Sequence, residues 1–304
     1  MITLFSCPKP FLGHIDTIQR NAIRSWRMLQ PGPEIILMGN EEGVEEVVEE
    51  FRLRHIRHIE RNDHGTPLLG SLFYSAENAA SHSLMCYINA DIILLNDFMP
   101  GIQKTLWFKS HCLMIGQRWN LDVKGPIDFS QNWQERLRRE VKEKGKLGIP
   151  NAMDYFVYHK GIFDNLLPFA LGRTMWDDWL VSKARLQGTP VVDLTHMVRV
   201  IHQNHTYSHH VRGGKGVLKG EEARRNIELA KGYLFAFTTW DSDYELRNDG
   251  VHRGSFLFRL YGNLVSLSKK HPFLKPVARV VRLGREGIRF SVYFLRNAFR
   301  FHFN

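Results

Sequence analysis

Residues 84–93 read LMCYINADII. The apolar run Leu84–Asn89 is typical of a buried strand, and the polar residues Asn89 and Asp91 come at its end. Because side chains alternate along a strand, both are predicted to point the same way at the carboxyl edge of a sheet. Ligands of open α/β sheets bind at that edge, where a carboxylate can hold Mg²⁺ or Mn²⁺ against a diphosphate. The alternative is an aspartate that caps the turn after a core strand.

The chain before this stretch alternates strand and helix patterns. Apolar runs predict strands at Ile2–Ser6, Ile35–Met38, His55–Ile59 and Leu84–Asn89, and helical spacing predicts helices over residues 15–29, 41–51 and 67–80. Thr66 is the expected N-cap of the third helix and Pro67 its first residue. This alternation predicts an α/β fold with a mainly parallel, Rossmann-like sheet flanked by helices.

The second half of the chain continues the same mixture. Strands are predicted at Cys112–Gln117, Ala152–Tyr158 and Val191–Leu194, and helices at Trp133–Lys144 and Met175–Leu186. The charge pattern changes near Asn248-Asp249-Gly250. We therefore expect a catalytic domain over residues 1–249 and a basic helical appendage over residues 250–304.

The net charge of +10 belongs to the tail. Residues 251–304 hold eleven Lys or Arg and one acid, Glu286, so residues 1–250 are neutral. A nucleic-acid-binding protein would carry basic clusters on its body as well. That alternative is therefore disfavoured, and no nucleic-acid partner is expected.

A second chemical motif is GRTMWDDWL, residues 172–180. Successive residues on a helix diverge by about 100°, so Asp177 and Asp178 face different ways. One is a candidate base, and the other favours the helix N-terminus electrostatically. Trp176 and Trp179 are candidates for stacking on a ligand, although an N-cap followed by two core tryptophans explains the same pattern.

A third motif is rich in histidine. Residues 202, 205, 209 and 210 are all His within the segment VIHQNHTYSHH, residues 200–210. Imidazole suits Zn²⁺, but the nearby sequence lacks the cysteine and acidic ligands of a closed zinc site. A histidine-rich surface loop is the alternative, above all for His209 and His210.

In this order the three motifs resemble those of GT-A nucleotide-sugar transferases, over residues 1–247. Asn89-Ala90-Asp91 is similar to the Asp-x-Asp motif of that family, with Asn89 in place of the first Asp. The segment around Asp177 is similar to the helix whose acidic residue deprotonates the acceptor hydroxyl in inverting members, and Trp176 stands where those enzymes often have Glu. His202 is placed like the C-terminal histidine that joins the metal and diphosphate, with His205 as second choice.

The resemblance implies a metal-dependent, inverting glycosyltransferase that uses a nucleotide-sugar donor and Mn²⁺ or Mg²⁺. Asp91 and His202 are the expected metal ligands, and Asp177 is the expected base, with Asp178 as its neighbour. Asp154 and Trp176 are expected to meet the acceptor, a glycan or a lipid-linked glycan. Expected donor-binding residues are Thr66 and Pro67 at a helix N-terminus, Asn89, and Lys215 in the basic loop Arg212–Gly216.

A sugar nucleotidyltransferase is the nearest alternative enzyme. It would need a glycine-rich basic loop directly after the first strand, and residues 6–11, SCPKPF, have none. The sequence therefore favours a transferase that uses a sugar nucleotide over one that makes it.

The tail is predicted to be a basic amphipathic helix. Its cations share one helical stripe, and apolar residues follow a similar period on another face. The basic stripe is Lys275, Arg279, Arg282, Arg289, Arg296 and Arg300, and the apolar one is Val277, Val281, Ile288, Val292, Leu295 and Phe299. Such a helix is typical of an anionic membrane surface, the alternative being a helical hairpin packed on the catalytic domain or on a second subunit.

The predicted location follows from what the sequence lacks. We see no secretory signal and no apolar run of membrane-spanning length, and the three cysteines do not suggest a disulfide framework. A cytoplasmic protein is expected, peripheral on the cytosolic face of a membrane.

Overall fold

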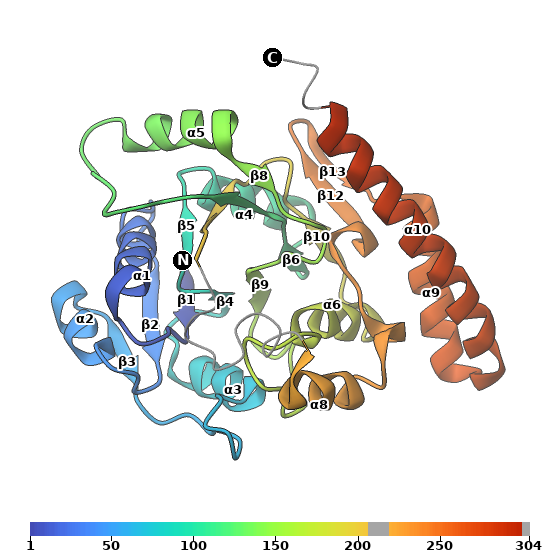
Figure 1. The fold of residues 1–304 in the computed structure, drawn as a ribbon. Coiled ribbons are helices and arrows are strands. Elements are labelled where there is room, and N and C mark those ends of the chain that lie inside the picture. The colour runs from blue at the N-terminus through green and yellow to red at the C-terminus, as the bar shows by residue number, and fades with distance from the viewer. Residues whose placement is uncertain (206–218, 300–304) are drawn as a thin grey trace.

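The computed structural model describes residues 1–205 and 219–299. Two sheets lie at its centre with helices around them (Figure 1). The larger sheet has nine strands in the order β13-β12-β10-β6-β9-β4-β1-β2-β3, and the smaller has the order β5-β11-β7-β8.

The first half of the larger sheet is the predicted parallel arrangement. Strands β1 (Ile2–Ser6), β2 (Glu34–Met38), β3 (Arg54–Ile56) and β4 (Leu84–Ile88) alternate with α1 (Gly13–Arg27), α2 (Val44–Phe51) and α3 (Leu69–Ala79). β1 pairs in parallel with both β2 and β4, and β2 with β3. The carboxyl ends of these strands therefore meet at one edge of the sheet.

The second half contains the antiparallel elements. β9 (Tyr155–His159) runs antiparallel to both β4 and β6 (Leu113–Ile115). β10 (Val191–Asp193) is parallel to β6 and to β12 (Tyr244–Arg247), and β13 (Gly250–Arg253) closes the sheet antiparallel to β12. The prediction of a mainly parallel α/β sheet is confirmed.

Apolar side chains cover both faces of the larger sheet because its strands are buried on both sides. Leu4 packs in one core with α1 and α4 (Phe98–Phe108), and its neighbour Phe5 packs in the other with α3 and α6 (Trp176–Leu186). The smaller sheet consists of β5 (Ile92–Leu94), β11 (Val200–Gln203), β7 (Arg118–Leu121) and β8 (Lys146–Leu147). Its far face packs on α5 (Trp133–Lys144) in a third core.

One predicted helix start is wrong. α3 begins at Leu69, with Leu68 as N-cap, so Thr66 and Pro67 lie before it. Thr66 is hydrogen-bonded to Asn62 instead. The Asn62 side chain accepts the Thr66 N–H at 3.0 Å, and the Asn62 N–H donates to the Thr66 carbonyl at 3.0 Å. The Leu69 N–H donates to the Phe169 carbonyl, so neither residue stands at an open helix N-terminus.

The chain after residue 219 returns to the body of the molecule. α8 (Glu221–Leu229) leads to the β12–β13 hairpin, whose turn contains Asp249, the predicted domain boundary. Helices α9 (Phe256–Lys270) and α10 (Lys275–Phe299) then lie side by side along one edge (Figure 1). Their inner faces join the same core as α6 through Tyr261, Val265 and Ala278.

A buried ion pair fixes α10 to the body. Arg285 Nε donates to Asp241 Oδ1 at 2.9 Å, and the two side chains are 3% and 0% exposed. The guanidinium also lies 4.7 Å from the ring centre of Tyr261 on α9. This pair sets which face of α10 points inward, and Arg285 is not one of the cations of the predicted basic stripe.

Arg285→Leu is expected to lower the free energy of unfolding by about 3–5 kcal/mol, because the carboxylate of Asp241 would stay buried without its partner. Urea unfolding followed by circular dichroism measures this change. Arg279→Leu, at an exposed position of the same helix, is the matched control and should stay within about 0.5 kcal/mol. Equal losses in the two variants would contradict the structural role of the pair.

Candidate active site

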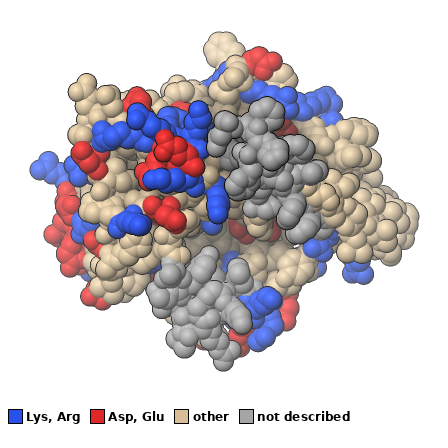
Figure 2. Space-filling model, turned by 45° about the horizontal axis from the view of Figure 1, so that its top comes forward, with Lys and Arg blue, Asp and Glu red and all other residues tan. Residues whose placement is uncertain are grey.

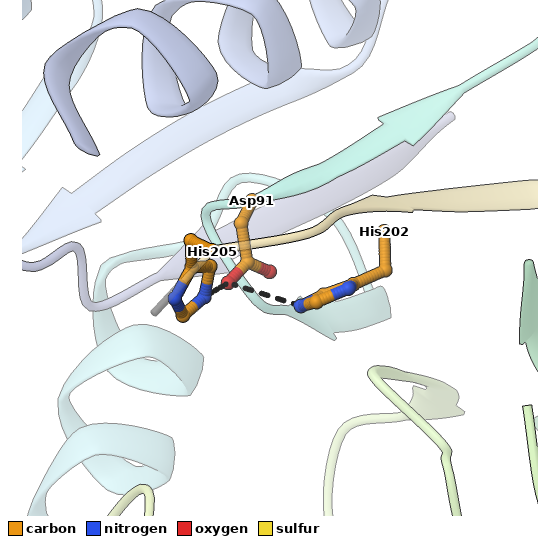
Figure 3. A group of neighbouring side chains, drawn as sticks. All are labelled: Asp91, His202 and His205. Carbon is orange, nitrogen blue, oxygen red and sulfur yellow. Dashed lines mark hydrogen bonds and ion pairs between the residues drawn. The ribbon is translucent and has the colours of Figure 1, made fainter. Parts of the chain in front are cut away.

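Asp91 lies in the turn between β4 and β5, at the carboxyl end of β4. Its backbone carbonyl accepts hydrogen bonds from the main chain and side chain of Gln203, which fixes the turn to β11. His202 on β11 and His205 just after it approach the same carboxylate (Figure 3). His205 Nε2 lies 3.0 Å from Asp91 Oδ2, and His202 Nε2 lies 3.8 Å from it.

These three side chains have the properties of a metal site. Each offers a ligand atom, and the three atoms lie within 4.8 Å of one another. Among the described residues, Asp91 Oδ1 and His202 Nδ1 are buried without a hydrogen-bond partner. One carboxylate and two imidazoles form a donor set suited to Mn²⁺ or a similar divalent ion.

The electrostatic surroundings favour the protonation states that a metal requires. Burial lowers the pKa of His202, and the negative charge of Asp91 opposes that effect. Burial alone would raise the pKa of Asp91, but His202, the hydrogen bond from His205 and the charge of Lys9 hold it well below its usual range. A neutral imidazole and an ionised carboxylate are the forms that ligate metals.

Lys9 brings a positive charge to this group from the loop after β1. Its Nζ lies 3.2 Å from His205 Nε2 and 3.9 Å from Asp91 Oδ2. Burial lowers the pKa of Lys9, and the carboxylates of Asp91 and Asp154 oppose that effect. The flexible stem of lysine lets the ammonium withdraw from an arriving cation or turn toward a phosphate.

Asn89 lies outside β4, which ends at Ile88, and its side chain has other partners than that of Asp91. Its Nδ2 donates to Asp154 Oδ1 at 2.6 Å, and its Oδ1 accepts from the Tyr87 hydroxyl at 2.8 Å. Arg118 Nη1 completes the network with bonds of 3.0 and 2.8 Å to the two oxygens of Asp154. The Asn89 side chain therefore positions Asp154, and its predicted contact with the donor stays a prediction.

Asp177 lies in the first turn of α6. Its Oδ1 accepts the Asp178 backbone N–H at 2.9 Å. Burial, aided by the negative charge of Asp154, raises the pKa of Asp177 to about 7, although the charge of Arg118 opposes it. A carboxyl group with a pKa near the working pH has the property of a general base.

The two tryptophans of this helix are not equivalent. Trp176 is 4% exposed and packs edge-on against Tyr87, with ring centres 5.3 Å apart, so its predicted stacking on an acceptor sugar is wrong. It is a core residue because the first turn of α6 is buried under β4 and β9. Trp179 is half-buried and packs against Phe169.

The remaining expected residues make local contacts or lie outside the described chain. Arg173 Nη2 donates to the Thr66 hydroxyl at 3.2 Å, and Pro67 forms a β-bridge with Arg61, so both residues serve a local structural network. Lys215 and the loop 212–216, like His209 and His210, lie outside the described residues.

A cavity of about 520 Å³ lies on the side of the smaller sheet that faces away from the Asp91 cluster. Trp119 lines it, whereas the neighbouring residue Arg118 binds Asp154. Since adjacent side chains of a strand point to opposite faces, this cavity is separate from the Asp91 cluster.

Sequence reasoning missed two cations of the site, Lys9 and Arg118. Lys9 follows β1 directly, and its place at the carboxyl edge of that strand was the available signal. Arg118 begins β7, whose four residues carry too weak a pattern to predict a strand. His205, the second choice from sequence, lies nearer to Asp91 than His202 does.

No family model matches the chain, and no curated protein matches it. Among solved structures, 306 chains match. S. aureus TarS has a TM-score of 0.50 at 10% identity, over 77% of this chain and 39% of that chain. The complex of TarS 1–349 with UDP-GlcNAc has a TM-score of 0.46 at 11% identity, over 67% and 58%. M. tuberculosis glucosyl-3-phosphoglycerate synthase has a TM-score of 0.48 at 16% identity, over 78% and 80%.

These neighbours are GT-A glycosyltransferases. The match to TarS at a TM-score of 0.50 shows that this chain has the GT-A fold, as its sequence predicted. The chain spans 39% to 60% of the length of the TarS chains that it matches.

Proposed function

We propose that this protein is a metal-dependent glycosyltransferase that moves a sugar from a nucleotide-sugar donor to an acceptor hydroxyl. One observation carries the proposal. A metal-competent cluster at the carboxyl end of β4 shares its electrostatic surroundings with a carboxyl group whose pKa is about 7. Asp154 and Arg118 connect the two, since both affect the pKa of Asp177 and that of Lys9 beside Asp91.

The roles follow from the chemistry of each side chain. Asp91, His202 and His205 would hold Mn²⁺ or Mg²⁺, which supplies charge to neutralise the nucleoside-diphosphate leaving group. Asp177 accepts the proton of the acceptor hydroxyl as the hydroxyl oxygen bonds to the sugar carbon. Asp178 lies in the same turn of α6. With one base and no covalent intermediate, the transfer inverts the sugar carbon.

The network around Asp154 orients the acceptor side of the reaction. Because Arg118 binds both oxygens of Asp154, that carboxylate is held in one place beside Asp177. We propose that Asp154 and Arg118 contact a sugar hydroxyl while they set the pKa of the base. The acceptor is a glycan or a lipid-linked glycan.

Thermal unfolding with UDP, GDP and ADP, each with and without Mn²⁺, tests the proposal. One nucleotide at about 100 times its dissociation constant should stabilise the protein by about 2.7 kcal/mol, and only in the presence of the metal. EDTA should remove this stabilisation, and the corresponding nucleoside, which has no phosphate groups, should not produce it. If none of the three diphosphates raises the midpoint with Mn²⁺, the proposed donor class is wrong.

A further inference from the structure

Exposed apolar side chains gather on the helical hairpin α9–α10. Ten large apolar residues between positions 256 and 288 are at least 40% exposed, whereas residues 1–255 contribute eight. Phe273 at 74% and Leu283 at 73% are the most exposed of the ten. The set is Phe256, Leu257, Leu260, Leu267, Phe273, Val277, Val280, Val281, Leu283 and Ile288. Contiguous exposed apolar surface of this kind marks an interaction site.

This apolar surface faces away from the body of the protein. Tyr261, Val265 and Ala278 occupy the inner side of the hairpin, and Arg285 is tied to the buried Asp241. Neither helix can therefore rotate to cover its exposed residues against the core. In Figure 2 the right-hand side of the molecule, where α9 and α10 lie, is mostly tan with blue along its edges, whereas blue and red lie close together on the left.

The hairpin is strongly basic, and Glu286 is its one acidic residue. No Asp or Glu occurs from Val251 to Arg285. Exposed cations flank the apolar residues, with Lys269 and Lys270 ending α9 and Lys275 and Arg279 beginning α10. Their side chains can cover apolar surface with their stems while the charged ends reach outward.

The exposed apolar residues and the positive charge together indicate what kind of partner binds this surface. A second copy that met the surface symmetrically would bring like charges together, which is unfavourable. An anionic lipid surface offers opposite charge and apolar volume at the depth of a helix radius. In the described part of the chain, no helix is long and apolar enough to span a bilayer, so the hairpin would lie along the interface.

We propose that the outer face of the α9–α10 hairpin docks on an anionic phospholipid bilayer. The sequence predicted a membrane contact through one stripe of α10. The structure adds α9 to that surface through Phe256, Leu257 and Leu260. The proposal goes beyond glycosyl transfer and does not depend on it.

Sedimentation of the full chain with vesicles tests the docking. Vesicles of phosphatidylcholine alone are compared with vesicles that contain about 30% phosphatidylglycerol, at low and high salt. The protein should bind only the anionic vesicles, and binding should fall as salt rises. The variants Leu257→Glu on α9 and Leu283→Glu on α10 should each lower the partition coefficient about tenfold or more.

Tyr74→Glu is the matched control, since Tyr74 is equally exposed on α3 at 71%. All four proteins should show the same circular dichroism and unfolding midpoint, because every substituted side chain is exposed. A full chain that stays in the supernatant with anionic vesicles at low salt would overturn the proposal. So would equal losses in Tyr74→Glu and Leu283→Glu, or a dimer in light scattering that Leu283→Glu dissociates while neither protein binds vesicles.

Discussion

Asp91→Ala is expected to abolish Mn²⁺-dependent nucleotide binding and to lower turnover by a factor on the order of 10³ or more, since metal-ligand charge stabilisation contributes several kcal/mol. The Asp91 carboxylate is the one anionic member of this cluster of three, so its removal leaves two imidazoles beside the ammonium of Lys9. The fold should survive, because the main chain of Asp91, not its side chain, holds Gln203. Calorimetric titration with Mn²⁺ and nucleoside diphosphate measures the loss.

Variants of the two histidines provide a comparison for the effect of Asp91→Ala. His205→Ala and His202→Ala should each weaken the same binding less than Asp91→Ala, because one imidazole and the carboxylate remain. His14→Ala, at an exposed position of α1, should bind normally. Full turnover of Asp91→Ala in the presence of EDTA would show that the cluster does not hold the catalytic metal.

The order of strands and helices was accessible from sequence because both faces of the parallel sheet are buried. Strands β1, β2 and β4 read as continuous apolar runs, and the helices between them show helical spacing. The direction of β9 was not accessible, since an apolar run does not say whether its neighbours are parallel. The smaller sheet was hidden because its strands have two to four residues.

The site was accessible only in part. Asp91 and Asp177 were found because each follows a local pattern, a strand end and a helix start. The contacts of Asn89 depend on Asp154, 65 positions away, and the proximity of Arg118 to Asp154 depends on how two sheets pack. Trp176 was misplaced because a buried and a ligand-facing tryptophan have the same sequence pattern at the start of a helix.

In the tail, too, the sequence pattern predicted the helix but not its tertiary contacts. Its periodicity correctly predicted an amphipathic helix, which the structure gives as α10. The predicted basic stripe did not include Arg285, but its buried partner Asp241 was not predictable, because the pair forms between segments that are distant in the sequence. The apolar face of α9 was missed since the sequence signal there is weaker than the basic stripe that follows it.

Asp177→Asn is expected to lower turnover by a factor on the order of 10² to 10⁴ and to leave donor affinity nearly unchanged. Asparagine keeps the oxygen that accepts the Asp178 N–H, so the start of α6 should stay intact. Asp178→Asn is the matched control. Normal turnover in Asp177→Asn together with a collapse in Asp178→Asn would move the base by one residue, and normal turnover in both would exclude α6 as its source.

The pH dependence tests the same assignment independently. Because only the ionised carboxylate accepts a proton, wild-type turnover should rise with pH through about 7 and then level off. Arg118→Met removes a charge that lowers the pKa of Asp177 and should move this rise to higher pH, whereas Asp154→Asn removes a charge that raises it and should move the rise to lower pH. Shifts in the same direction for both variants would contradict the assignment.

Stability should change with pH in the opposite sense to activity. A carboxyl group whose folded pKa exceeds its unfolded value of 3.8 favours folding while it is protonated, and this contribution is lost as pH rises toward about 7. Asp177→Asn has no carboxyl group at this position and so cannot lose this contribution. The unfolding midpoint of the variant, relative to that of the wild type, should therefore rise between pH 4 and pH 8. A variant that is less active at every pH and relatively more stable at high pH is what a buried base requires, since the burial that tunes its pKa also makes its ionised form costly.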